Sequence, residues 1–308
     1  MSARHRALAL ASVLFVLCGT AAGASREVAI TIDDLPRGGD GGGRTFEEVR
    51  GMTVRLLALL REQKIPVTGF VHPGRTELAP LELRGILDLW LDAGAELGNH
   101  TYSHADLNTV SVAEYEQEIL KAEPALLSAL QARGKKLEFF RYPMLHAGPT
   151  LETKLAIEEF LAAHHYRNAP VTLDDSDYMF AVAYLNPNLA ARVKREYVPY
   201  LESVAAFFER RSVEVAGREF PQIMLLHANE MNSRMMPEIL EMFRRRSYRF
   251  ITLDEALEDA VYRLPETYVG RGGFSWIHRW SMTKGMPNKG EPDAPEWVRQ
   301  AFAESRHP

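Results

Sequence analysis

The chain has 308 residues, of which 46% are hydrophobic and 25% charged, and its formal net charge is -5. A chain of this length and apolar content can bury a sizeable core, and the mixing of charge signs along it excludes a largely disordered protein. The mild acidity excludes nucleic acid as an expected partner, because phosphate backbones attract basic surfaces. We expect one large domain, with or without a small appendage.

The first 24 residues have the pattern of a secretory signal peptide. Arg4 and Arg6 precede an apolar run over 7–19, and small residues at 22–24 form a cleavage site. The run is short for a membrane span, so we expect cleavage and an exported mature chain, periplasmic or secreted, without stable membrane insertion. An uncleaved N-terminal anchor is the alternative. Cleavage removes Cys18, the only cysteine, so any metal ligands would be histidines and carboxylates.

Short apolar runs alternate with longer helical patterns along the mature chain. The runs typical of strands lie at 28–32, 67–71, 95–98, 137–140, 167–173, 223–226 and 249–253. The helical patterns lie at 46–63, 81–93, 112–130, 151–163, 188–210 and 236–246, and capping residues at 252–255 indicate one more. This alternation favours parallel strand pairing. It predicts an α/β fold, a distorted (β/α) barrel with about seven strands.

Three regions follow from these patterns. Residues 1–24 are expected to be the signal peptide, and residues 25–262 the catalytic domain. Residues 263–308 are rich in glycine, proline, arginine and tryptophan and lack clear periodicity. We therefore expect this last segment to be an irregular extension packed on the barrel.

Two pairs of polar residues lie at the ends of expected strands, where the chemistry of such barrels is placed. Asp33 and Asp34 end the first strand, and His100 and His104 follow the third. Histidines four residues apart share a face of a helical turn, close enough to bind one ion. If Asp34 binds the same ion, its charge is neutralised, and Asp33 is free to act as a base on a water that the metal acidifies.

At this point the sequence resembles the polysaccharide deacetylases, the metal-dependent carbohydrate esterases that include chitooligosaccharide and peptidoglycan deacetylases. The resemblance extends over 26–260 and includes five motifs in the order of the family. The matching segments are Thr31-Ile32-Asp33-Asp34, His100-Thr101-Tyr102-Ser103-His104, Arg141-Tyr142-Pro143, Asp174-Asp175-Ser176-Asp177-Tyr178 and Leu225-Leu226-His227.

The resemblance implies roles for the residues around the metal. Asp33 would be the general base, and Asp34, His100 and His104 would hold one divalent metal. Arg141 would contact and orient the base. A site of two histidines and one aspartate suits Zn²⁺, although Co²⁺, Ni²⁺ or Mn²⁺ could occupy it.

The resemblance also implies roles on the substrate side of the site. His227 would be the general acid that protonates the leaving amine, and Asp174 would pair with it and raise its pKa. The backbone N–H of Tyr142 would help to bind the oxyanion. Tyr178 and Leu225 would form the walls of the acetyl pocket.

The chain departs from the family pattern at several positions. Ile32 and Leu35 stand where the first motif usually has phenylalanine and glycine, and residues 144–147 separate Pro143 from the next glycine. Tyr178 stands where tryptophan is common. Further residues that could line the cleft are His72, His146 and 227–232.

The predicted function is the removal of acetyl groups, most readily N-acetyl groups, from an amino-sugar-containing glycan or another acetylated sugar. One alternative is hydrolysis of another amide, an imide or an O-acetyl ester on the same metal site. An alternative from another class is a non-catalytic glycan-binding protein with a relic site. The presence of Asp33 and His227 argues against the last, because a binding protein needs neither a base nor an acid.

Overall fold

The structure is a computed structural model that describes residues 26–40 and 45–306. The expected signal peptide lies outside the described residues. Within the described part, no helix combines the length and the apolar character that a membrane span requires.

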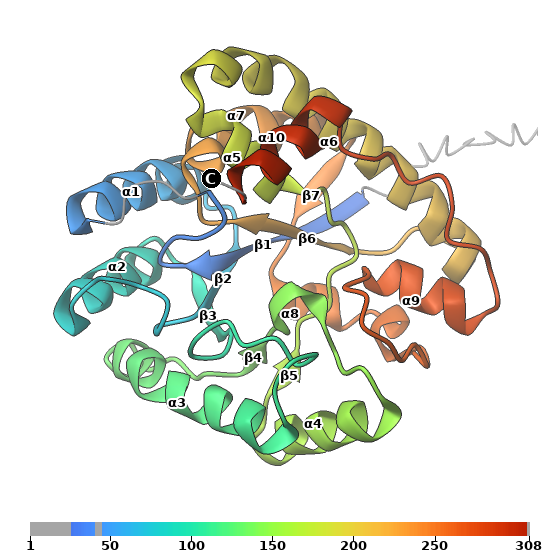
Figure 1. Cartoon of the computed structure of the whole chain (residues 1–308), viewed down its shortest axis with the longest axis horizontal. Helices are drawn as coiled ribbons and strands as arrows, with labels where there is room; N and C mark the ends of the chain where they lie inside the picture. Colours follow the sequence, from blue (N-terminus) through green and yellow to red (C-terminus); the bar gives the residue numbers. More distant parts are fainter. Residues whose placement is uncertain (1–25, 41–44, 307–308) are drawn as a thin grey trace, which may run out of the picture.

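In the described part of the chain seven strands form one sheet at the centre of the molecule, and helices surround it (Figure 1). The strands are β1 (Arg26–Leu35), β2 (Val67–Val71), β3 (Glu96–Asn99), β4 (Phe139–Phe140), β5 (Arg167–Asn168), β6 (Gln222–His227) and β7 (Tyr248–Phe250). Their order is β5-β4-β3-β2-β1-β6, β7 pairs with β1, and each pairing is parallel. The predicted distorted (β/α) barrel is therefore confirmed.

The chain after β5 brings the two edges of the sheet together. Leu173 forms a parallel bridge with Met224 of β6, and the N–H of Thr172 donates to the carbonyl of Ile223 at 3.0 Å. The expected strand over 167–173 is thus reduced to the two residues of β5 and a separate contact with β6. The segment between them crosses from one neighbour to the other, so it cannot stay in register with either.

The helices follow the strands in sequence and pack outside them. They are α1 (Phe46–Glu62), α2 (Pro80–Asp92), α3 (Val112–Gln131), α4 (Leu151–Ala163), α5 (Asp177–Leu185), α6 (Pro187–Ala216), α7 (Glu230–Arg245), α8 (Leu253–Leu257), α9 (Trp276–Thr283) and α10 (Glu296–Ser305). The expected capping boxes are present, with Ser111 capping α3 and Thr252 capping α8. In both, the serine or threonine side chain and a glutamate three residues later satisfy backbone N–H groups at the start of the helix.

Neither α5 nor the first turns of α7 were expected from the sequence pattern. In α7 the side chain of Asn229 accepts from the N–H of Asn232, so the helix starts six residues before the expected 236. Pro237 lies inside α7, and its presence in the sequence made an earlier start difficult to see.

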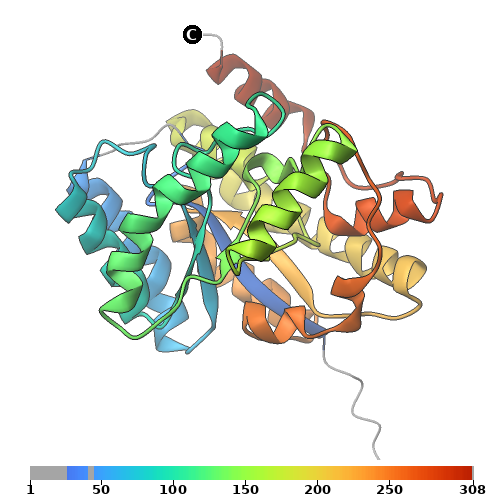
Figure 2. The same cartoon turned by 90° about the horizontal axis from the view of Figure 1, so that it is seen from below.

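The C-terminal segment was expected to be irregular, but it contains α9 and α10. These short helices form because apolar side chains become buried against the barrel domain, such as Ile277, Trp280 and Val298. Figure 1 shows α10 beside α5, and in Figure 2 α10 lies at the opposite end of the molecule from the start of β1. The last helix of the extension therefore lies at the end where the carboxyl ends of the strands are.

Candidate metal centre and catalytic cleft

Most of the residues expected in the site line one cavity of about 540 Å³ at the carboxyl ends of the strands. Asp33 and Asp34 come from the end of β1, and His227 from the end of β6. The cavity is lined by Asp33, Asp34, Gly39, Arg75, His100, His104, Met144, Leu145, His146, Asp174, Tyr178, Leu225, His227, Gly273, Phe302 and Arg306. The barrel thus brings together groups that are far apart in the sequence.

An irregularity at the end of β1 places two successive carboxylates at the same cavity. On a regular strand neighbouring side chains point to opposite faces. Here Asp34 has a left-handed backbone with φ of 65°, and the pairing of β1 with β2 shifts register between Ile32 and Leu35. Gly38 then passes so close that a Cβ on it would lie 2.4 Å from Asp34 Oδ2. A glycine is required there because a side chain would displace the carboxylate.

Asp34, His100 and His104 form a compact set of metal donors. One ligand atom from each lies within 4.8 Å of the others. Asp34 Oδ1 lies 3.6 Å from His100 Nε2 and 3.3 Å from His104 Nε2. Among the described residues no donor makes a hydrogen bond of good geometry to this buried oxygen, and imidazole nitrogens lie 3.3–3.6 Å from it. Such an arrangement is costly unless an ion binds the oxygen. Two imidazoles and one carboxylate fit a divalent cation with open positions for other ligands.

The protonation of the two histidines suits metal binding. Burial lowers the pKa of His100 well below its ordinary value, and burial also lowers the pKa of His104 to about 4. Both rings are therefore neutral near pH 7, as ligands must be. His100 Nδ1 lies 2.8 Å from the carbonyl oxygen of Arg141. A proton on Nδ1 that donates there leaves Nε2 free for the metal.

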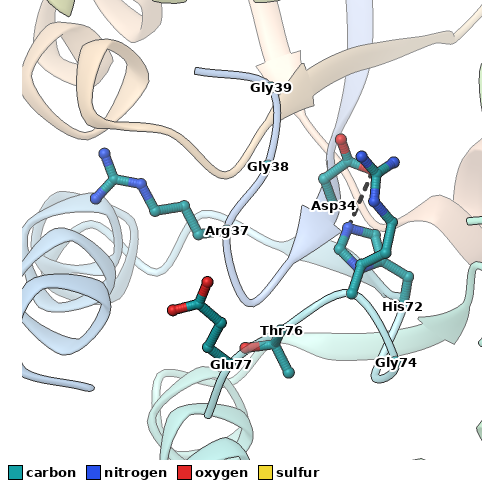
Figure 3. Close-up of a pocket in the computed structure, with 9 residues that line it drawn as sticks. Asp34, Arg37, Gly38, Gly39, His72, Gly74, Thr76 and Glu77 are labelled. Atoms are coloured by element: carbon teal, nitrogen blue, oxygen red, sulfur yellow. Dashed lines mark ion pairs between the residues drawn. The ribbon is translucent and has the colours of Figure 1, made fainter. Parts of the chain in front are cut away.

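A third imidazole contacts the carboxylate from another direction. His72 Nε2 lies 3.4 Å from Asp34 Oδ1, and Figure 3 shows the two side chains facing each other. His72 was expected to line the cleft. It instead borders a neighbouring cavity of about 370 Å³, which shares Asp34, Gly39 and Arg75 with the first.

Asp33 is held by a buried arginine. Arg141 Nη1 donates to Asp33 Oδ1 at 2.7 Å and to Thr31 Oγ1 at 2.6 Å, and both charged side chains are at most 3% exposed. Burial raises the pKa of Asp33 to about 6, although the charge of Arg141 opposes the shift. Asp33 Oδ2 lies 3.7 Å from His100 Nε2, so the oxygen that Arg141 does not hold is beside the metal donors.

His227 pairs with Asp177, not with Asp174 as expected. Asp177 Oδ1 lies 2.6 Å from His227 Nδ1, and Asp177 Oδ2 accepts from the backbone N–H of His227 at 2.8 Å. Burial alone would lower the pKa of His227, but the charge and hydrogen bond of Asp177 raise it to about 10. Asp177 is the first residue of α5, so the start of this helix fixes it beside β6. Asp174 borders the cavity instead, and burial raises its pKa.

The remaining expected residues lie on the walls. Tyr178 and Leu225 both border the cavity, and the Tyr178 ring contacts those of His227 and Phe302 edge to face, at 6.1 and 5.2 Å between centroids. The buried side chain of Tyr142 borders a different cavity. Its expected contribution through the backbone N–H remains a prediction.

Two parts of the site were outside the reach of sequence reasoning. Phe302 and Arg306 come from the C-terminal extension, which gave no local signal of proximity to β1. The role of Asp177 was missed because the resemblance assigned the pairing with His227 to Asp174, the first aspartate of the same motif. The apolar run that follows Asp177 is typical of a helix and was the one local signal for a helix start there.

Comparisons with known proteins bear on the family that the sequence resembles. Residues 21–158 match the family model described as polysaccharide deacetylase. No curated protein sequence matches the chain significantly.

Several solved structures share the fold. The polysaccharide deacetylase Bc1974 from Bacillus cereus is 16% identical with a TM-score of 0.53, over 74% of this chain and 91% of that chain. The peptidoglycan deacetylase PdaC from Bacillus subtilis is 20% identical with a TM-score of 0.50, over 78% of this chain and 94% of that one. BA3943 from Bacillus anthracis, a CE4 family pseudoenzyme, is 18% identical with a TM-score of 0.51, over 76% of this chain and 66% of that chain. Residues 21–158 thus match the polysaccharide deacetylase family, which confirms the resemblance seen in the sequence, and the solved structures show that the chain shares the fold of such proteins.

Proposed function

We propose that this chain is an exported, metal-dependent hydrolase that removes acetyl groups, chiefly N-acetyl groups, from an amino-sugar-containing glycan of the cell wall. The observation that carries the proposal is the presence of three kinds of group in one cavity. These are the donors Asp34, His100 and His104, the arginine-held carboxylate of Asp33, and the protonated His227.

A divalent cation, for which we propose Zn²⁺, would be held by Asp34, His100 and His104 and would supply Lewis-acid polarisation of the acetyl carbonyl. Asp33 accepts the proton of the attacking water through Oδ2, since Arg141 already occupies Oδ1. Arg141 also fixes the direction of that carboxylate.

His227 performs the second proton transfer. With Nδ1 bonded to Asp177, its Nε2 donates a proton to the departing amine nitrogen, which makes the amine a better leaving group. The backbone N–H of Tyr142 stabilises the oxyanion, and Tyr178 with Leu225 encloses the acetyl methyl group. Export is supported by the N-terminal sequence pattern.

The test is acetate release from chitooligosaccharides, peptidoglycan and acetylated xylan, before and after chelation. The proposal predicts release from the N-acetylated substrates, loss with chelator and recovery when Zn²⁺ is added back. Release from acetylated xylan alone would favour the O-acetyl esterase alternative. A chain that binds these glycans and releases no acetate with any divalent metal would be a binding protein, as one similar fold is named a pseudoenzyme.

A further inference from the structure

His72 occupies a fixed and buried position beside the metal donors. It follows β2 directly, and its backbone N–H donates to the carbonyl of Leu35 at 3.1 Å. The residue is 2% exposed. The pairing of β1 with β2 therefore determines where the imidazole lies relative to Asp34.

The contact of His72 is with the same oxygen that faces the metal ligands. Asp34 Oδ1 lies 3.4 Å from His72 Nε2, comparable to its separation from the Nε2 atoms of His100 and His104. The backbone at Gly38 leaves no room for a side chain on the other side, because a Cβ there would lie 2.4 Å from Asp34 Oδ2. The Asp34 side chain is thus confined between a glycine backbone and an imidazole (Figure 3).

The polarity of the His72 ring fits a donor to this carboxylate. Among the described residues its buried Nδ1 has no hydrogen-bond partner. The ring therefore makes its polar contact through Nε2, and a carboxylate oxygen requires that this nitrogen carry a proton. Burying Nδ1 without a hydrogen-bond partner costs desolvation free energy. The contact of Nε2 with Asp34 offsets that cost.

The position of the ring indicates an outer partner of the ligand, not a fourth ligand. The ring of His72 lies 6.5 Å from that of His100 and 5.6 Å from that of His104, whereas the two ligand rings are 5.0 Å apart. His72 approaches the donor set on the side of the carboxylate. It lies outside the compact group formed by Asp34, His100 and His104.

We propose that His72 is a positioning residue for the metal centre, and that its Nε2–H holds the Asp34 carboxylate in the orientation that binds the cation. The proposal rests on the metal centre of the proposed function. Partners of this kind orient the ligand, and their loss typically lowers metal affinity about 10- to 100-fold. His72 thereby serves Asp34 as the Arg141 carbonyl serves His100.

The test measures Zn²⁺ binding to the chelated, full mature chain by calorimetry with a competing chelator. His72→Phe keeps a buried ring and removes the donor, and His72→Gln keeps an N–H donor. His278→Gln is the matched control, because it changes another buried histidine that lies in α9. X-ray absorption of the zinc-loaded wild type counts the bound imidazoles.

We expect the wild-type chain to bind one Zn²⁺ with two imidazole ligands. His72→Phe should lose about 10- to 100-fold in Zn²⁺ affinity. His72→Gln should recover part of this loss, and His278→Gln should keep the wild-type affinity. Wild-type affinity in His72→Phe would overturn the proposal, and so would three bound imidazoles. If His72→Phe fails to fold, two other variants supply the same comparison. His72→Leu removes the N–H donor, and His72→Asn keeps one. A His72-dependent affinity in a chain that releases no acetate would overturn the proposed function and leave this inference standing.

Discussion

Replacement of Asp177 by asparagine removes the charge that keeps His227 protonated. Asp177 is 1% exposed and contacts both the ring and the backbone of His227. Asparagine has nearly the same shape, so the substitution changes the electrostatics more than the packing. Burial of His227, which lowers its pKa, would then act without its main opposing cause.

The size of the effect follows from the pKa of the acid. In the wild type this pKa is raised to about 10, so about 99% of the imidazole is protonated at pH 8. Without Asp177 only the charges of Asp34 and Asp33 oppose the burial. We therefore take the ordinary imidazole pKa of about 6.5, at which about 3% is protonated at pH 8. Because the proton goes to the leaving amine, we expect about a 30-fold loss of kcat at pH 8, and a smaller loss at pH 6.

The assay is the pH dependence of acetate release for the wild type, Asp177→Asn and Asp174→Asn. The alkaline limb should move from about pH 10 to about pH 6.5 in Asp177→Asn. Asp174→Asn is the matched control for the position of this limb, because His227 pairs with Asp177. Thermal unfolding at pH 6 checks that both variants are folded. An unchanged limb in Asp177→Asn, or a shift only in Asp174→Asn, would refute the reasoning.

Three further predictions concern the proposed base Asp33, the orientation of the Asp34 carboxylate and the proposed acid His227. Asp33→Asn should lower kcat by about 10²- to 10⁴-fold with Zn²⁺ stoichiometry unchanged by calorimetry, and a variant that keeps most of its turnover would exclude Asp33 as the base. Gly38→Ala should weaken Zn²⁺ binding, because its Cβ would lie 2.4 Å from Asp34 Oδ2, whereas Gly51→Ala in α1 would meet nothing nearer than 3.5 Å; equal affinities in the two variants would contradict this. The raised pKa of His227 stabilises the folded chain fully below its unfolded value of about 6.5. That contribution is lost as the pH rises through about 10. Melting temperatures from pH 6 to 10.5 should therefore fall more in the wild type than in Asp177→Asn, and parallel curves would exclude the linkage.

Sequence patterns predicted the parts of the fold that depend on local periodicity. Short apolar runs between helical patterns were sufficient to predict the strands of the barrel wall, since each of these strands buries a continuous apolar segment. They failed at β5, where the chain changes neighbours, and at α10, whose stability comes from contacts with α5 and α6. Trp297 illustrates the second failure, because its indole N–H donates to Glu196 at 2.9 Å and that partner is remote in the sequence.

The candidate site was predictable to the extent that its residues belong to short motifs. The convergence of Asp34 with His100 and His104 followed from their places at strand ends. Which aspartate pairs with His227, Asp174 or Asp177, did not follow from such places. It depends on the residue at which α5 begins. The contact of His72 with Asp34 depends on a local register shift in β1, which the apolar pattern of the strand does not reveal.

The central claim is that one divalent cation joins groups from β1 and from the loop after β3. Crystals of the mature chain soaked in Zn²⁺ and measured at the zinc absorption edge test it most directly. We predict one strong anomalous peak within about 2.0–2.2 Å of an Asp34 oxygen and of the Nε2 atoms of His100 and His104. A zinc-saturated crystal without a peak between these three side chains, or with zinc bound only elsewhere, would contradict the account.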